Sequence, residues 1–272
     1  MATFADLLSH VPDGLDARDI EILLLHVTQK DRTFVRTWPE YKLMPWQAQH
    51  YQQLLARLIT GEPLAYVLGE QAFWTLTLHV TPATLIPRPD TERLVEVALD
   101  KMAGRKGLSL LDLGTGSGAI ALSLASEHPT ATVCAVDLSV DALAVAQRNA
   151  ERHGLNQVQF LQGSWFESLA TDRHFDLIVS NPPYIDPADP HLVGLTHEPI
   201  TALTAAEQGL ADLRHIISHA PDYLNIGGWL LVEHGYDQGA AVRAMFESAG
   251  YRAVETFQDY GANDRVTVGQ KR

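Results

Sequence analysis

The chain has 272 residues, a formal net charge of −13 and an apolar content of 46%. That apolar content is too high for a disordered chain, and the length suits two domains or one large one. The negative charge argues against broad binding to DNA or RNA, which requires clustered Lys and Arg.

Residues 1–70 are predicted to form a small helical bundle. The first helix in that region has apolar residues at the i, i+3, i+4, i+7 spacing of an amphipathic helix: Ile20, Leu23, Leu24 and Val27. The second repeats the pattern with Tyr51, Leu54, Leu55, Leu58 and Ile59. The N-terminus shows no basic segment followed by an apolar one, so we expect no signal peptide. No apolar run approaches membrane-spanning length, and we expect a soluble, cytoplasmic protein without membrane contact.

Residues 71–86 are interpreted as a short hairpin or linker, because residues 73–80 alternate with a period of two. The segment that follows, Pro87-Arg88-Pro89-Asp90-Thr91-Glu92, opens a helix whose first turn carries acidic residues. Arg88 lies between two prolines on a stiff loop. A single cation presented in this way indicates a residue that faces a ligand.

Residues 87–272 are predicted to form an α/β domain. Short apolar runs alternate with helical segments, which indicates βαβ units and a mainly parallel sheet. The predicted helices cover Ser117–Glu127, Leu138–His153, about 204–224 and 237–249. The single Cys134 lies in a predicted core strand and permits no intrachain disulfide, which fits a reducing compartment.

The first strand of this domain ends in a glycine-rich segment, Asp112-Leu113-Gly114-Thr115-Gly116-Ser117-Gly118. Alternate glycines permit a tight turn and let a ligand approach the backbone closely. Asp137 ends the next strand about 20 residues further on, where nucleotide-binding folds place an acid for ribose hydroxyls. The two signals together predict a site for an adenosine-type ligand. No Gly-Lys-Ser/Thr sequence follows, which excludes a Walker-type site.

The stretch Asn181-Pro182-Pro183-Tyr184 follows the apolar run from Phe175 to Val179. The two prolines stop regular structure and stiffen the loop. The Asn181 side chain offers a carbonyl acceptor, and the carbonyl of Pro182 is free to face a ligand. Tyr184 adds an aromatic surface. These features predict a site that grips a planar NH2 group and aims its nitrogen.

These motifs resemble class I S-adenosylmethionine-dependent methyltransferases, and more closely the HemK family of protein-glutamine N5-methyltransferases. The resemblance rests on six segments in the family order: LIPRPDTE, LDLGTGSGAIALSLA, SNPPYID, HEPITAL, GGWLLVEHGYDQG and NDRVTVG. It extends into the N-terminal region through EILLLHVT and GEPLAYVLGE. One departure lies before Glu198-Pro199, where Thr196 and His197 replace the Arg and aromatic residue common in the family.

The resemblance implies a Rossmann-like, mainly parallel seven-stranded sheet after a substrate-recognition bundle. It implies S-adenosylmethionine as methyl donor, S-adenosylhomocysteine as product, and the Gln of the Gly-Gly-Gln motif of class 1 peptide chain release factors as acceptor. Asp112 and Gly114–Gly118 would hold the cofactor's methionine and backbone, Asp137 its ribose and Trp165 its adenine. Asn181, Pro182 and Tyr184 would act in catalysis, and Asn181 would also contact the cofactor. Pro183, Arg88 and Glu198 would contact the substrate.

Other functions stay open at this stage. A glutamine methyltransferase of a large-subunit ribosomal protein shares most of these motifs. An amino-directed nucleic-acid methyltransferase also uses an Asn-Pro-Pro-aromatic stretch and would reach its base by flipping, but the charge of −13 opposes it. A non-catalytic nucleotide-binding module is the third alternative. The His spacing predicts no metal site, and we expect a monomer that does not bind nucleic acid directly.

Overall fold

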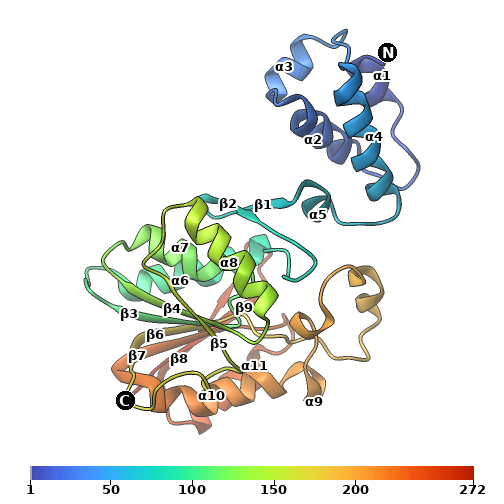
Figure 1. Cartoon of the computed structure of the whole chain (residues 1–272). Coiled ribbons are helices and arrows are strands. Elements are labelled where there is room, and N and C mark those ends of the chain that lie inside the picture. The colour runs from blue at the N-terminus through green and yellow to red at the C-terminus, as the bar shows by residue number, and fades with distance from the viewer. Residues whose placement is uncertain (1) are drawn as a thin grey trace. The chain divides into compact units, whose positions relative to one another are not determined.

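The protein is described by a computed structural model that covers residues 2–272. These residues form two compact units that divide after Glu70 (Figure 1). The first unit is helical and the second contains the large sheet, so each is described by itself.

The first unit is built from five helices among the described residues: α1 (Phe4–Ser9), α2 (Ala17–Thr28), α3 (Arg32–Thr37), α4 (Pro45–Ile59) and α5 (Leu64–Leu68). Asp16 caps α2 by accepting a hydrogen bond from the backbone N–H of Arg18, and Pro45 begins α4. The predicted apolar face of α2 is fully buried, as expected. The prediction was wrong for Ile59, which is exposed because it is the last residue of α4, beyond the packed turns.

A two-stranded hairpin, β1 (Glu70–Phe73) and β2 (Leu76–His79), follows. The alternating run at 73–80 is therefore not one strand. It is broken by a turn at Trp74, whose φ of 54° places it in the left-handed region. Glu92 holds this turn by accepting a hydrogen bond from the backbone N–H of Trp74 at 2.8 Å.

The large sheet has seven strands in the order β5-β4-β3-β6-β7-β9-β8. Their bounds are β3 (Ser109–Leu113), β4 (Thr132–Asp137), β5 (Gln159–Gln162), β6 (Phe175–Ser180), β7 (Leu224–Glu233), β8 (Arg252–Gln258) and β9 (Asp264–Gln270). All pairs are parallel except those made by β9, which runs antiparallel to both neighbours. The predicted mainly parallel, seven-stranded α/β sheet is confirmed.

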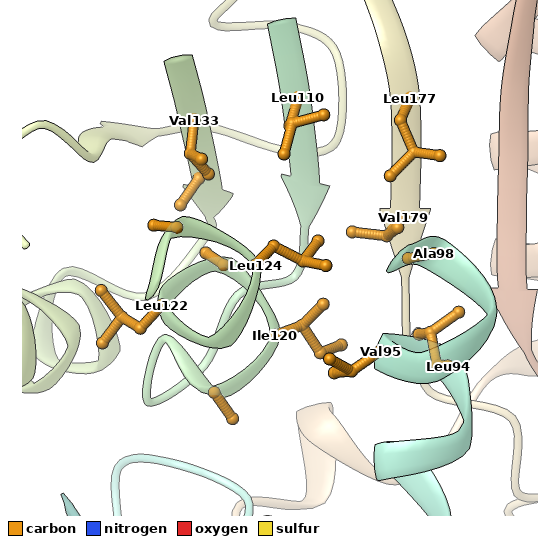
Figure 2. Close-up of a cluster of buried hydrophobic side chains, with 14 of the residues drawn as sticks. Leu94, Val95, Ala98, Leu110, Ile120, Leu122, Leu124, Val133, Leu177 and Val179 are labelled. Atoms are coloured by element: carbon orange, nitrogen blue, oxygen red, sulfur yellow. The ribbon is translucent and has the colours of Figure 1, made fainter. Parts of the chain in front are cut away.

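Helices cover both faces of this sheet (Figure 1). Those of the second unit are α6 (Glu92–Met102), α7 (Ala119–Glu127), α8 (Val140–Arg152), α9 (Ala206–Gly209), α10 (Ala211–Tyr223) and α11 (Gly239–Ser248), with 3-10 turns η1 (Pro89–Thr91), η2 (Pro190–Leu195) and η3 (Ile200–Ala202). Figure 2 shows the core on the α6–α7 face, where Val95 and Ile120 from the helices meet Leu110 and Val179 from the strands. The other face packs against α10 and α11.

The helix predicted near 204–224 is divided into α9 and α10, because Glu207 and Gln208, inside the short α9, adopt left-handed backbone angles. Gly209 explains the break. A Cβ atom at Gly209 would lie 1.9 Å from the carbonyl oxygen of Tyr184. The chain therefore bends to let two backbone segments approach, and a residue with a side chain could not take this position.

The strand order determines where the site lies. The chain leaves β3 to build β4 and β5 on one side, and then returns to place β6 and β7 on the other. Ligands of such sheets bind beyond the carboxyl ends of the strands at this reversal. Leu113 of β3 pairs with Val136 of β4 and with Ser180 of β6, so the segments that follow all three strands emerge together.

Candidate active site

Asp112 is a buried carboxylate at the end of β3. Its Oδ2 accepts hydrogen bonds from the Thr115 hydroxyl at 2.6 Å and from the backbone N–H of Ala121 at 3.2 Å. Its Oδ1 has no partner among the described residues. Burial raises the pKa of Asp112 to about 7. An unpaired, buried carboxylate oxygen of this kind suits a ligand that brings a hydrogen-bond donor or a positive charge.

The loop after Asp112 presents its backbone to a ligand. Gly114, Gly116 and Gly118 have φ values of 72°, 57° and 85°, which favour glycine. A Cβ at Gly116 would meet no atom within 4 Å, so open space adjoins the backbone there. Thr115 and Ser117 are buried, and the hydroxyl of Thr115 donates a hydrogen bond to Asp112.

Asp137 joins the end of β4 to this loop. Its Oδ2 accepts a hydrogen bond from the backbone N–H of Gly116 at 2.7 Å, and its Oδ1 accepts one from Ser139 at 2.9 Å. Burial raises its pKa. Trp165, which has a φ of 48°, places its ring 3.5 Å from the Cβ position of Gly114. Asp112, Asp137 and Trp165, which the sequence analysis assigned to one ligand, therefore all lie next to the glycine loop at 114–118.

Asn181 follows β6 directly, and its side chain is held by one partner. Its Nδ2 donates a hydrogen bond to Oγ1 of the buried Thr91 at 3.1 Å. Neither Asn181 Oδ1 nor the Pro182 carbonyl accepts a hydrogen bond from residues 2–272. Both oxygens are available to an outside donor.

Tyr184 is fixed at both ends. Its hydroxyl donates to Glu233 Oε1 at 3.2 Å, and its carbonyl accepts from Gln238 Nε2 at 3.0 Å. Burial and the neighbouring carboxylate of Glu233 raise the pKa of Tyr184. Burial also raises the pKa of Glu233, to about 7. Tyr184 therefore serves as a neutral donor to Glu233.

A cavity of about 90 Å³ brings these groups together. It is lined by Leu85, Arg88, Asn181, Pro182, Tyr184, Ile185, Leu195, Ala202, Leu203 and Glu233. Four residues that sequence selected share this lining: Arg88, Asn181, Pro182 and Tyr184. Pro183 and Glu198 are not part of it.

Arg88 forms an ion pair with Glu198. Glu198 Oε2 accepts from the guanidinium, and Oε1 accepts from the backbone N–H of Ile86 at 3.0 Å. The Glu198 side chain is 2% exposed. Arg88, which the sequence analysis expected to face a ligand, is thus paired with Glu198 within the protein. This ion pair links the irregular 185–203 loop to the segment before η1.

Thr91 and Glu233 are the site residues that sequence reasoning missed. Glu233 is the last residue of an apolar strand, as Asp137 is, and Asp112 is the next-to-last residue of another, so that shared signal could have identified Glu233. Thr91 lay inside a segment interpreted only as a helix start. Among residues 2–272 no group of three or more His, Cys, Asp or Glu is placed to hold a metal ion. Within the same residues no helix is long and apolar enough to cross a membrane.

The sequence matches two described families. Residues 2–69 match a PrmC N-terminal domain, and residues 105–261 match a methyltransferase domain. A release factor glutamine methyltransferase of Vibrio cholerae is 56% identical over 93% of this chain and 89% of its own length. The protein of that description from Escherichia coli K12 is 52% identical over 93% of this chain and 91% of its own length.

A solved structure supports the fold of the second unit. A 16S rRNA methyltransferase of T. thermophilus, solved with AdoMet and guanosine, superimposes with a TM-score of 0.57. It is 22% identical in sequence and covers 75% of this chain and 50% of its own. At this identity the likeness shows a common fold.

Proposed function

The chain belongs to the release factor glutamine methyltransferase family, and from this premise we propose that it methylates the side-chain amide nitrogen (N5) of a release factor glutamine. The acceptor is the Gln of the Gly-Gly-Gln motif of class 1 peptide chain release factors. S-adenosylmethionine is the methyl donor and S-adenosylhomocysteine the product. The observation that carries the proposal is the pair of unoccupied acceptors, Asn181 Oδ1 and the Pro182 carbonyl, beside one cavity.

These acceptors fit the nucleophile. A primary amide has two N–H donors, and its nitrogen lone pair is delocalised into its own carbonyl. Asn181 Oδ1 and the Pro182 carbonyl each accept one N–H, which fixes the nitrogen, favours its pyramidal form and directs its lone pair toward the methyl group. Such positioning can lower a barrier by up to roughly 7–11 kcal/mol. No general base is required, since the proton can leave after the methyl arrives.

The residues of the glycine loop fit the cofactor. Bound S-adenosylmethionine supplies an electrophilic methyl group on a sulfonium. Asp112, with its unpaired buried Oδ1, suits the charged methionine end. The backbone at residues 114–118 would hold the cofactor, with Asp137 toward its ribose and Trp165 toward its adenine. Asn181, which follows the neighbouring strand β6, would lie on the substrate side of the methyl group.

On the substrate side, Tyr184 and the stiff Pro182-Pro183 pair shape the slot for the glutamine side chain. Arg88 and Glu198 act on the substrate through the 185–203 loop, which their ion pair holds in place. Leu195, Ala202 and Leu203 of this loop line the cavity. Thr196 and His197, the two residues in which this chain departs from the family, directly follow η2 in this loop.

The first unit recognises the release factor, in this proposal, and the second unit, which begins at Gln71 and includes the β1–β2 hairpin in its core, carries the catalysis. The support is a separate bundle ahead of a complete catalytic domain, with Trp38 and Trp46 exposed on its surface. A chain that starts at Gln71, where the second unit begins, should retain cofactor binding and lose kcat/KM for the release factor. Full kcat/KM in that shortened chain would refute this role.

The protein further acts as a monomer in the cytoplasm without binding nucleic acid. The charge of −13 supports the last point, and the buried, unpaired Cys134 fits a reducing compartment. Sedimentation velocity at micromolar concentration tests the monomer.

The function is tested by offering labelled S-adenosylmethionine to three acceptors in parallel: a purified release factor, large-subunit ribosomal proteins and RNA. Label on the release factor alone is the expected result. Label on a ribosomal protein or on RNA instead would keep the methyl-transfer chemistry and overturn the acceptor.

A further inference from the structure

The loop from Asn181 to Tyr184 is stiff, and its main chain has few hydrogen-bond donors. Pro182 and Pro183 have no N–H, and their rings restrict the backbone angles of the loop. A shift at Tyr184 is therefore passed on to the Pro182 carbonyl, which accepts one N–H of the substrate amide in the proposed reaction. The contacts that hold Tyr184 thus decide where that carbonyl lies.

The peptide group that joins Tyr184 to Ile185 is held on both sides. Its N–H, which belongs to Ile185, donates a hydrogen bond to the carbonyl of Leu203 at 3.0 Å, within a one-residue parallel bridge between Ile185 and Thr204. Its carbonyl, which belongs to Tyr184, accepts a hydrogen bond from Nε2 of Gln238 at 3.0 Å. Gln238 lies between β7 and α11, so a side chain from a distant segment fixes the end of the loop.

Gln238 uses both ends of its side-chain amide. Its Oε1 accepts a hydrogen bond from the backbone N–H of Gly235 at 2.8 Å. Its Nε2 donates to the carbonyl of Tyr184 and also to that of Gln208, the latter at 3.2 Å. A reversed amide would place its oxygen against two carbonyls and its NH2 group against an N–H. The three contacts therefore select one orientation, in which the NH2 group faces two main-chain carbonyls.

The backbone of α9 is strained where it meets this amide. Glu207 and Gln208 have φ values of 55° and 58°, and Gly209 follows at 81°. Left-handed angles are unfavourable for residues with a Cβ, and they persist only where the surrounding contacts enforce them. A Cβ at Gly209 would lie 1.9 Å from the Tyr184 carbonyl oxygen. The strained turn, the glycine and Gln238 thus all meet at the same carbonyl.

We propose that Gln238 is a positioning residue of the methyl-transfer reaction, which holds the Tyr184 carbonyl and thereby sets the Pro182 carbonyl that receives the substrate amide. The inference rests on the proposed function and extends it. Gln238 is not among the residues that line the cavity, so it acts through the loop and not on the substrate. Its loss should lower the rate of methyl transfer and leave the cofactor site intact.

The first test separates the two ends of the Gln238 amide in methyl transfer to a release factor. Gln238→Glu keeps an oxygen for the Gly235 N–H, but at pH 8 its carboxylate has no proton to donate. We expect kcat to fall by about 10²-fold, the scale of a misplaced reacting group. Gln238→Met, which loses both ends, should show the same loss. If the amide served only to close the turn at Gly235, Gln238→Glu would keep the wild-type kcat, and that result would overturn the inference.

The affinity for S-adenosylmethionine and the KM for the release factor should stay within about twofold of the wild type in both variants. A loss of cofactor affinity as large as the loss of kcat would show general damage and would overturn the inference. Gln270→Glu is the matched control. Gln270 also accepts from one group, Arg252, and donates to a main-chain carbonyl, that of Gly227. It lies at the far end of β9, where that strand pairs with Trp229, and its variant should keep kcat within about twofold.

Hydrogen exchange at the Ile185 amide tests the same contact without any acceptor protein. In Gln238→Glu the peptide group loses the bond to its carbonyl, so this N–H should exchange about 2- to 10-fold faster, the range for one lost hydrogen bond. Exchange at the wild-type rate would overturn the inference. A wild-type protein inactive on every release factor would instead refute the proposed function.

Discussion

The ion pair between Arg88 and Glu198 offers a sharp test of how the cavity is maintained. Replacing Arg88 with Met keeps the length and apolar volume of the side chain and removes its charge. Glu198 would then retain only the backbone N–H of Ile86 as partner, while its side chain is 2% exposed. The uncompensated carboxylate should favour opening of the 185–203 loop, because opening lets water reach it.

The magnitude follows from the burial of the two partners. Breaking a fully buried pair costs about 3–5 kcal/mol, whereas an exposed pair contributes about 0–1 kcal/mol. Arg88 is 39% exposed and Glu198 is almost completely buried, so the cost lies between these limits, at about 2 kcal/mol. The double variant Arg88→Met with Glu198→Gln should recover part of this energy, because its buried group is neutral.

Native-state hydrogen exchange at the Ile86 amide measures this opening directly, since that N–H is bonded to Glu198. About 2 kcal/mol corresponds to roughly 30-fold faster exchange. Arg105→Met, which breaks the more exposed pair with Asp176, should leave the Ile86 amide unchanged. Unchanged protection of Ile86 in Arg88→Met would refute the anchoring of the loop by this pair.

Three further predictions follow from the site. Asn181→Ala removes one of the two amide acceptors and should lower kcat by about 10²–10³-fold, as loss of a transition-state hydrogen bond does; calorimetry should show cofactor affinity largely intact, and an equal loss of both would contradict the assigned role. Gly209→Ala should abolish activity because its Cβ would lie 1.9 Å from the Tyr184 carbonyl, whereas Gly154→Ala, also at positive φ but with no atom within 4 Å, should retain kcat. Asp112→Asn should weaken cofactor binding and change the pH dependence of stability. Burial raises the pKa of Asp112 to about 7 in the folded state, so folding takes up a proton and wild-type stability falls as the pH rises from about 4 to about 7. Asn cannot ionise, and urea unfolding at pH 5 and pH 8 should show a smaller decrease; an equal decrease in both proteins would contradict the prediction.

The sequence predicted the sheet and the site segments that are continuous along the chain. The apolar strands and their alternation with helices were sufficient to predict a mainly parallel α/β sheet but not its strand order, and the glycine loop and Asn181 each follow a strand end directly. Both patterns consist of residues that are adjacent in the chain, so they can be recognised without knowledge of tertiary contacts.

Contacts between distant segments could not be predicted in this way. Thr91 and Asn181 lie 90 residues apart in sequence, and Arg88 and Glu198 lie 110 apart. The sequence indicates that each of these four residues lies near a strand end or in a loop. It does not indicate which of them contact each other. The interruption of the predicted helix at Gly209 could not be predicted for the same reason. Its cause is the close approach of the Tyr184 backbone and not a local sequence pattern.

The measurement that tests the central claim most directly is the location of the transferred methyl group. A release factor incubated with the protein and S-adenosylmethionine is digested and analysed by mass spectrometry, beside the same factor with its Gly-Gly-Gln glutamine changed to alanine. The account predicts one methyl group on the nitrogen of that glutamine and none on the altered factor. Methylation of both factors, or of another residue in the first, would contradict it.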